Sequence, residues 1–182
     1  MAPVFFALLL QGNDLAAGLL FAFAAATDFV DGLIARTTHS VSRLGQLLDP
    51  AVDRVLMICA VIGLVVVNRI PLWIVILVLV RDAVLLVGQE YLLRTYHERI
   101  AVIFPGKVAT TFLFVGLAGL LINTPQIAGL GLVDVGWLPG FNAFDCSWGI
   151  WFVYIGLIIG VFTTIFYVKQ GIAALKRHRE VL

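Results

Sequence analysis

Charged residues are scarce in this chain of 182 residues. Only 13% are Asp, Glu, Lys or Arg, whereas 62% are hydrophobic and the mean hydropathy is +1.06. A soluble domain, in which about half of the residues are apolar, cannot bury that much apolar surface. The formal net charge of +1 comes with no basic patch suited to phosphate backbones, so we expect no nucleic-acid partner. The composition predicts a membrane protein.

Cysteine is scarcer still, with only two residues. Cys59 lies in an apolar run and Cys146 in a polar stretch, with no histidine near either, which excludes a disulfide framework and a zinc site. Alternating barrel-type patterns and internal repeats are absent, and helices are the remaining structure that can span a bilayer. We therefore expect a single membrane domain over residues 1–182.

Six apolar segments follow one another along the chain. Five have the length of a membrane span, whereas the first, Pro3 to Leu10, rises only about 12 Å against a hydrocarbon core of about 30 Å. The sequence thus predicts an all-α bundle of six helices with a truncated first helix. The segments are Pro3 to Leu10, Leu15 to Ala35, Leu44 to Val67, Leu72 to Leu93, Ile103 to Ile122 and Ile150 to Val168.

Basic residues follow the second, fourth and sixth segments, but none occurs between Asn123 and Gly149. The positive-inside bias therefore predicts a multi-pass protein of the cytoplasmic membrane with those three segment ends in the cytoplasm. The stretch from Asn123 to Gly149 is then an external loop, and its aromatic residues suit the headgroup region.

Four aspartates interrupt the second and third apolar segments: Asp28, Asp31, Asp49 and Asp53. A carboxylate at mid-membrane costs about 2.5–3.5 kcal/mol on insertion scales, so such residues indicate function. Intervals of three and four place each pair on one helical stripe, and we expect the two stripes to face each other across a hairpin. Divalent cations with oxygen ligands, Mg²⁺ or Mn²⁺, would neutralise such a cluster and still bind phosphate.

The complete pattern is Asp28-x2-Asp31-Gly32-x2-Ala35-Arg36-x8-Gly45-x3-Asp49-x3-Asp53. It resembles the signature of the CDP-alcohol phosphatidyltransferases at every fixed position. The resemblance covers most of the chain and implies the six-helix transmembrane bundle of that family, with the signature on the second and third helices. It also implies a homodimer among membrane lipids, with the active site facing the cytoplasm.

The resemblance implies a role for each motif residue. Asp28, Asp31, Asp49 and Asp53 are expected to bind two divalent cations, Mg²⁺ or Mn²⁺. Asp53 is also expected to act as the catalytic base. Binding of the CDP group falls to four residues, namely Gly32, Ala35, Arg36 and Gly45. The implied reaction transfers the phosphatidyl group of CDP-diacylglycerol to an alcohol and releases CMP.

Arg81-Asp82 in the fourth segment and Lys107 at the start of the fifth resemble patterns in bacterial phosphatidylglycerophosphate synthases and actinobacterial cardiolipin synthases. Arg81 and Lys107 are thus candidates to bind an acceptor phosphate. The acceptor is expected to be glycerol-3-phosphate, with phosphatidylglycerol, the substrate of a cardiolipin synthase, as the alternative. The alternative interpretations involve no substrate. Arg81-Asp82 would then be a neutralising ion pair, and Lys107 an interfacial basic residue that sets the membrane topology.

Two rival functions use the same aspartates. A cation transporter would relay ions through intramembrane carboxylates, although transporters commonly repeat such acids in two halves and here all four lie in one hairpin. A catalytically inactive membrane scaffold is the other rival. Cation-dependent release of CMP would separate the enzyme from both.

Overall fold

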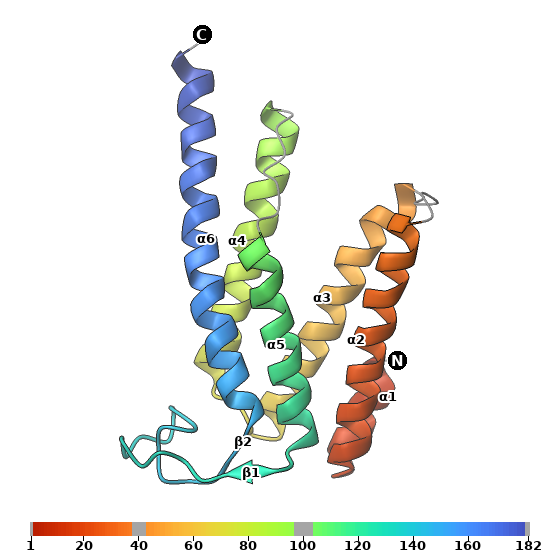
Figure 1. Cartoon of the computed structure of the whole chain (residues 1–182), viewed down its shortest axis with the longest axis vertical. Coiled ribbons are helices and arrows are strands. Elements are labelled where there is room, and N and C mark those ends of the chain that lie inside the picture. Colours follow the sequence, from red (N-terminus) through yellow and green to blue (C-terminus); the bar gives the residue numbers. More distant parts are fainter. Residues whose placement is uncertain (1, 38–42, 97–103, 181–182) are drawn as a thin grey trace. The chain divides into compact units, whose positions relative to one another are not determined.

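The computed structural model describes residues 2–37, 43–96 and 104–180, and most of the described residues are helical (Figure 1). The predicted apolar segments match the helices closely, although α6 continues well beyond Val168. The elements are α1 (Ala2–Leu10), α2 (Asp14–Thr37), α3 (Arg43–Val66), α4 (Leu72–Tyr96), α5 (Phe104–Ile122), β1 (Gln126–Ile127), β2 (Cys146–Ser147) and α6 (Gly149–Glu180).

Several helices end where the backbone turns into the left-handed region. Gly12, between α1 and α2, has a φ of 77°, and Asn68 and Asn123, just after α3 and α5, have φ values of 55° and 58°. Glycine and asparagine adopt this conformation more readily than other residues, and both are common just past helix ends. These residues therefore stop apolar stretches that would otherwise continue as helix.

The chain divides into two compact units. The first unit comprises residues 1–71 and 114–153, and in it α1 contacts both α2 and α3. Phe21 of α2 is fully buried; its ring meets Phe5 of α1 edge to face at 5.9 Å and stacks on Phe114 of α5 at 6.0 Å. Aromatic pairs at such distances contribute to packing beyond the area that they bury. This cluster ties three helices of the first unit together.

The second unit comprises residues 72–113 and 154–182. Trp73 of α4 stacks on Tyr154 of α6, with ring centroids 6.3 Å apart. Gly156 of α6 lies against α5, where an added methyl group would come within 3.0 Å of the Leu113 backbone nitrogen. The small residue thus permits close packing of the two helices, as is common in membrane proteins.

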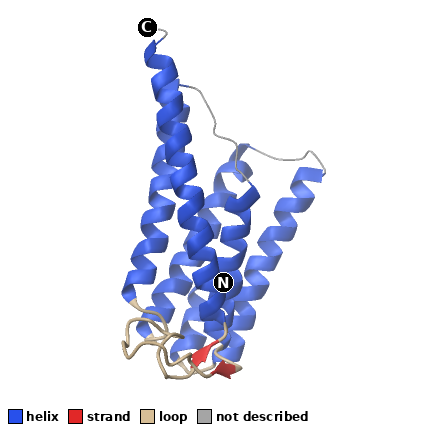
Figure 2. Cartoon of the chain, turned by 60° about the vertical axis from the view of Figure 1, so that its left-hand side comes forward, coloured by secondary structure: helices blue, strands red, loops and turns tan. Residues whose placement is uncertain are grey.

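The stretch between α5 and α6 folds into an ordered loop that contains both strands (Figure 2). β1 pairs with β2 in antiparallel register, Gln126 opposite Ser147 and Ile127 opposite Cys146. Ser147 is buried and its hydroxyl donates to the carbonyl of Gly119 in α5, at 2.7 Å. The loop is therefore fastened to the end of the helix that precedes it.

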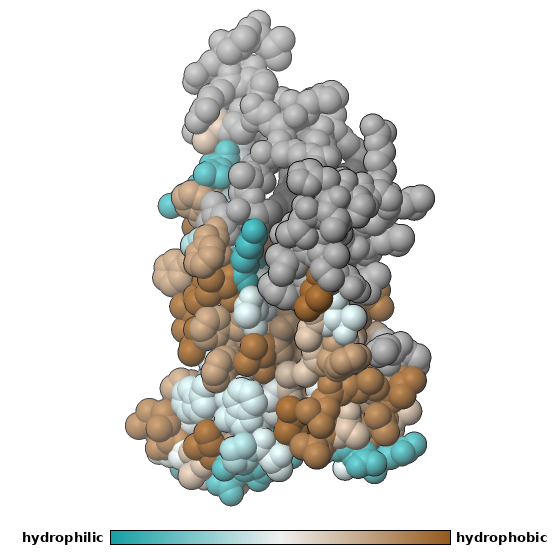
Figure 3. Space-filling view, turned by 45° about the vertical axis from the view of Figure 1, so that its right-hand side comes forward, coloured by the Kyte–Doolittle hydropathy of each residue, from teal (hydrophilic) through white to brown (hydrophobic). Residues whose placement is uncertain are grey.

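Within the described residues, two helical stretches are long and apolar enough to cross a bilayer: 104–122 in α5 and 149–173 in α6. Many large apolar side chains on the helices are exposed, among them Phe23, Phe104 and Phe162. Figure 3 accordingly shows broad hydrophobic areas on the described surface of the face in view. Such a surface suits lipid rather than water as its surroundings.

Candidate functional site

The acidic motif occupies neighbouring ends of two helices in the first unit. Asp28 and Asp31 belong to the carboxyl-terminal part of α2, and Asp49 and Asp53 to the amino-terminal part of α3. The two helices contact each other and are connected by only five residues, 38–42. The four aspartate positions therefore lie at the same end of one helix pair.

The register of α2 assigns these positions to a particular face. Ala17 and Phe21 are completely buried in the first unit, and a stripe that continues at intervals of three and four from them passes through positions 24, 28, 31 and 35. By helical register, positions 28 and 31 therefore lie on the same stripe of α2 as Ala17 and Phe21.

The register of α3 gives the same result. Met57, Ala60 and Leu64 are buried on this helix, whereas Ile58 and Ile62 are exposed. A stripe traced back from the buried residues at helical intervals reaches positions 53, 49 and 45. On both helices, therefore, the motif positions extend the face that is buried further along.

The structure does not describe the side chains of the motif residues. This holds for the four aspartates and for the predicted CDP-binding residues Gly32, Ala35, Arg36 and Gly45. Among the described residues, no three His, Cys, Asp or Glu side chains form a group that could hold a metal ion. The predicted metal-binding and CDP-binding roles thus stay predictions, supported by helix position and register.

An ion pair that the sequence did not reveal lies at the opposite end of the helix pair. Arg69, just after α3, donates to the carboxylate of Asp14 at the start of α2, at 2.5 Å. Its guanidinium also donates to the carbonyl of Leu121 in α5, at 3.0 Å. Asp14 and Asp28 are 14 positions apart, about 21 Å along a helix. In the sequence, the ion pair was indicated only by the opposite charges of Asp14 and Arg69, each next to the end of a predicted helix.

The candidate acceptor residues belong to the second unit. Arg81 of α4 is 7% exposed and donates to the carboxylate of the adjacent Asp82 at 3.0 Å. Its Nε atom is buried beside Gly160 of α6 and has no hydrogen-bond partner among the described residues. Lys107 is exposed in the first turn of α5. The predicted Arg81-Asp82 pair is confirmed, whereas acceptor binding stays a prediction.

The structure so far defines an α-helical protein with two candidate membrane spans and an acidic motif across two adjoining helices. A family model described as CDP-alcohol phosphatidyltransferase matches residues 1–166. The chain belongs to the CDP-alcohol phosphatidyltransferase family, which is a family of membrane proteins. The resemblance inferred from the motif is thus confirmed.

Curated relatives include proteins named for two acceptors. The chain is 37% identical over 121 residues to a CMP-forming cardiolipin synthase of Streptomyces coelicolor, covering 65% of this chain and 56% of the relative. It is 31% identical over 137 residues to the CDP-diacylglycerol–glycerol-3-phosphate 3-phosphatidyltransferase of Bacillus subtilis, covering 74% of this chain and 70% of the relative. The chain therefore spans little more than half the length of the Streptomyces relative.

Proposed function

We propose that the chain transfers the phosphatidyl group of CDP-diacylglycerol to the hydroxyl of a phosphate-bearing alcohol and releases CMP. The observation that carries this proposal is the placement of the motif. Its aspartate positions lie on adjoining ends of α2 and α3 and continue the buried stripe of each helix. Family membership over residues 1–166 supports the same reaction. A cation transporter has no comparable support from the family match.

The donor set fits divalent cations. Asp28, Asp31, Asp49 and Asp53 would supply carboxylate oxygens from two helices that contact each other, and Mg²⁺ and Mn²⁺ prefer such ligands. Two ions bound there would neutralise the diphosphate of the donor and stabilise negative charge on the leaving CMP. Four carboxylates close together without cations would repel one another or take up protons.

Asp53 is proposed as the general base. It accepts the proton of the acceptor hydroxyl, whose oxygen then bonds to the phosphorus that carries diacylglycerol. The bond from that phosphorus to the oxygen that bridges to the second phosphate breaks, and CMP departs with the electron pair. General-base catalysis of this kind contributes typically 10²–10⁴-fold.

The CDP group is proposed to bind along the same two helices. Gly32 and Ala35 on α2 and Gly45 on α3 have little or no side-chain bulk, which allows a nucleotide to approach the backbone closely. Arg36 supplies a guanidinium, the side chain best suited to phosphate oxygens. In the sequence, all four residues lie between Asp31 and Asp49.

For the acceptor we propose glycerol-3-phosphate, with Arg81 and Lys107 as candidate phosphate ligands. Within the described part of the chain, the buried Nε of Arg81 has no hydrogen-bond partner, which supports a ligand role because buried donors normally have a partner. Phosphatidylglycerol is the second candidate, favoured by the 37% identity to the Streptomyces cardiolipin synthase. Both acceptors carry phosphate, so basic residues alone do not distinguish them.

We also propose a six-helix transmembrane bundle in the cytoplasmic membrane, acting as a homodimer with the motif in the cytoplasm. The candidate spans in α5 and α6 support membrane insertion. The basic residues after the second, fourth and sixth predicted segments support the orientation. A cytoplasmic site suits a donor that carries a cytidine nucleotide.

The acceptor is tested by supplying purified protein with CDP-diacylglycerol and one alcohol at a time: glycerol-3-phosphate, phosphatidylglycerol, inositol phosphate or serine. Mass spectrometry then identifies the lipid product. Phosphatidylglycerophosphate as the main product supports the first proposal, and cardiolipin formed only with phosphatidylglycerol replaces it with the second. If CDP-diacylglycerol is consumed with none of the four, both proposed acceptors are wrong.

A further inference from the structure

The loop between α5 and α6, residues 123–148 and here called the cap loop, has its own hydrogen-bonded fold. The backbone N–H groups of Leu130 and Leu132 donate to the carbonyls of Gly140 and Phe141, each at 2.9 Å. The indole of Trp148 donates to the carbonyl of Thr124 at 3.2 Å. These hydrogen bonds pair part of the loop's polar backbone internally, which lowers the cost of placing that part in a less polar environment.

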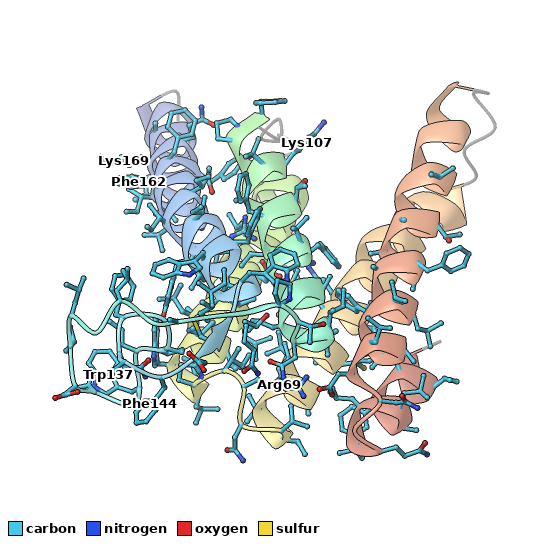
Figure 4. All side chains as sticks on the ribbon, turned by 60° about the horizontal axis from the view of Figure 1, so that its bottom comes forward. Arg69, Lys107, Trp137, Phe144, Phe162 and Lys169 are labelled. Carbon is cyan, nitrogen blue, oxygen red and sulfur yellow. The ribbon has the colours of Figure 1, made fainter. Side chains whose placement is uncertain are left out.

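This ordered loop exposes large apolar side chains. Leu132, Trp137 and Phe144 are 70%, 59% and 74% exposed. Figure 4 labels Trp137 and Phe144 on this loop. Large side chains held outward by a hydrogen-bonded backbone are typical of an interaction surface.

The place of the cap loop in the chain indicates what covers this surface. Its two ends, at Ile122 and Gly149, are also the ends of the two candidate membrane spans. The Ile122 end lies beside the Asp14 end of α2, because an added methyl group on Gly18 would meet the Ile122 side chain and backbone. The loop thus lies at the end of these helices opposite the acidic motif, where the two candidate spans begin and end.

Its composition also favours lipid. The cap loop contains no Lys or Arg, and its only charged residues are Asp134 and Asp145. Tryptophan and other aromatic residues are enriched where acyl chains meet headgroups. A surface of Leu, Trp and Phe flanked by two carboxylates matches that boundary, with the apolar side chains in the lipid and the carboxylates in water.

We propose that the cap loop docks into the adjacent lipid leaflet, with Leu132, Trp137 and Phe144 below the headgroups and Asp134 in water. The partner is therefore the phospholipid of the leaflet opposite the acidic motif. This inference is independent of the proposed catalytic function.

The test places nitroxide spin labels on full-length protein in which Cys59 and Cys146 are replaced by alanine. Single cysteines are introduced as Leu132→Cys, Phe144→Cys and, as matched control in the same loop, Asp134→Cys. Each protein is reconstituted into phosphatidylethanolamine–phosphatidylglycerol vesicles. Power saturation then compares collisions with oxygen, which concentrates in lipid, and with a water-soluble nickel chelate.

Labels at positions 132 and 144 are expected to collide several-fold more with oxygen than with nickel, and the label at 134 to show the reverse. If all three favour nickel, the cap loop projects into water and the proposal is wrong. If 132 and 144 are shielded from both reagents, a protein surface covers them, such as a second copy of the chain, which also overturns it.

A second readout needs no introduced cysteine. The fluorescence difference between wild type and Trp137→Phe isolates the emission of Trp137 from that of the other tryptophans. We expect lipids brominated near the top of the acyl chain to quench this difference more strongly than iodide in water. Stronger quenching by iodide would contradict the proposal even if a labelled variant failed to fold.

Discussion

Arg69 and Asp14, which are 55 positions apart in the chain, form an ion pair that joins the residues just after α3 to the start of α2. Their ion pair has side chains only 18% and 26% exposed, and the same guanidinium donates to the carbonyls of Leu120 and Leu121. These carbonyls belong to the last turn of α5, where no backbone N–H of the same helix remains to donate to them. One arginine thus connects α2, the residue stretch after α3, and α5 within the first unit (Figure 4).

Arg69→Met should therefore destabilise the first unit. It leaves Asp14 without its cation and the α5 carbonyls without their donor, and hydrogen bonds to charged groups contribute about 1.5–3 kcal/mol. We expect the free energy of unfolding to fall by about 2 kcal/mol, measured by thermal unfolding in detergent. Arg69→Lys keeps the charge but not the forked donor geometry of arginine. Its stability should therefore lie between those of the wild type and Arg69→Met. Equal melting of all three proteins would show that the ion pair contributes nothing measurable.

Gly116→Ala should disrupt the crossing of α5 and α6 in the first unit. A methyl group at this position would lie 2.7 Å from the Val153 backbone nitrogen and 2.9 Å from the Gly149 carbonyl oxygen. Because backbone atoms cannot move aside cheaply, we expect a loss of roughly 1–3 kcal/mol. Gly88→Ala is the matched control, since a methyl group there meets nothing within 4 Å. Gly88→Ala should leave the free energy of unfolding unchanged or raise it slightly. A similar loss of stability in both variants would argue against close packing of α5 and α6 at Gly116.

Arg81→Gln tests the acceptor assignment. If the buried guanidinium binds the acceptor phosphate, KM for the acceptor should rise about tenfold or more while KM for CDP-diacylglycerol changes little. Asp82→Asn is the control, because it removes the ion pair and keeps the guanidinium. A lower melting temperature with unchanged KM for the acceptor would instead identify Arg81-Asp82 as a structural pair.

Cys146 should be a slow nucleophile. Burial, and to a lesser extent the Asp145 carboxylate, raises the pKa of its thiol above the ordinary cysteine value. Because the thiolate is the reactive form, alkylation by iodoacetamide should be slow at pH 8 and still accelerate above pH 9. Asp145→Asn removes the smaller cause and should lower the pKa modestly. A rate that levels off below pH 8.5 would contradict this environment.

Much of the helical fold was predictable because its signals are local. Long apolar runs ended by polar or turn residues gave the start of α4 at Leu72 and the end of α5 at Ile122, as the structure has them. α6 extends to Glu180, beyond the predicted Val168, because good helix formers such as Ala173, Ala174 and Leu175 continue the helix after the apolar run ends.

Features that depend on distant residues were not predictable. The two-residue strands β1 and β2 are too short to show alternation and pair across the whole cap loop. The Asp14–Arg69 pair likewise depends on which helix ends meet. In the acidic motif, spacing predicted a shared stripe within each helix, and the buried residues of α2 and α3 now relate both stripes to the packed face of the first unit.

The most direct test of the central claim is release of CMP by purified protein in vesicles that contain CDP-diacylglycerol and the accepting alcohol. We expect release to require Mg²⁺ or Mn²⁺, to stop with chelator and to resume when the cation is restored. Asp53→Asn should lower the rate by at least 10²–10⁴-fold, whereas Asp145→Asn in the cap loop should leave it unchanged. Release that persists without divalent cations, or at the wild-type rate in Asp53→Asn, would contradict the proposed reaction.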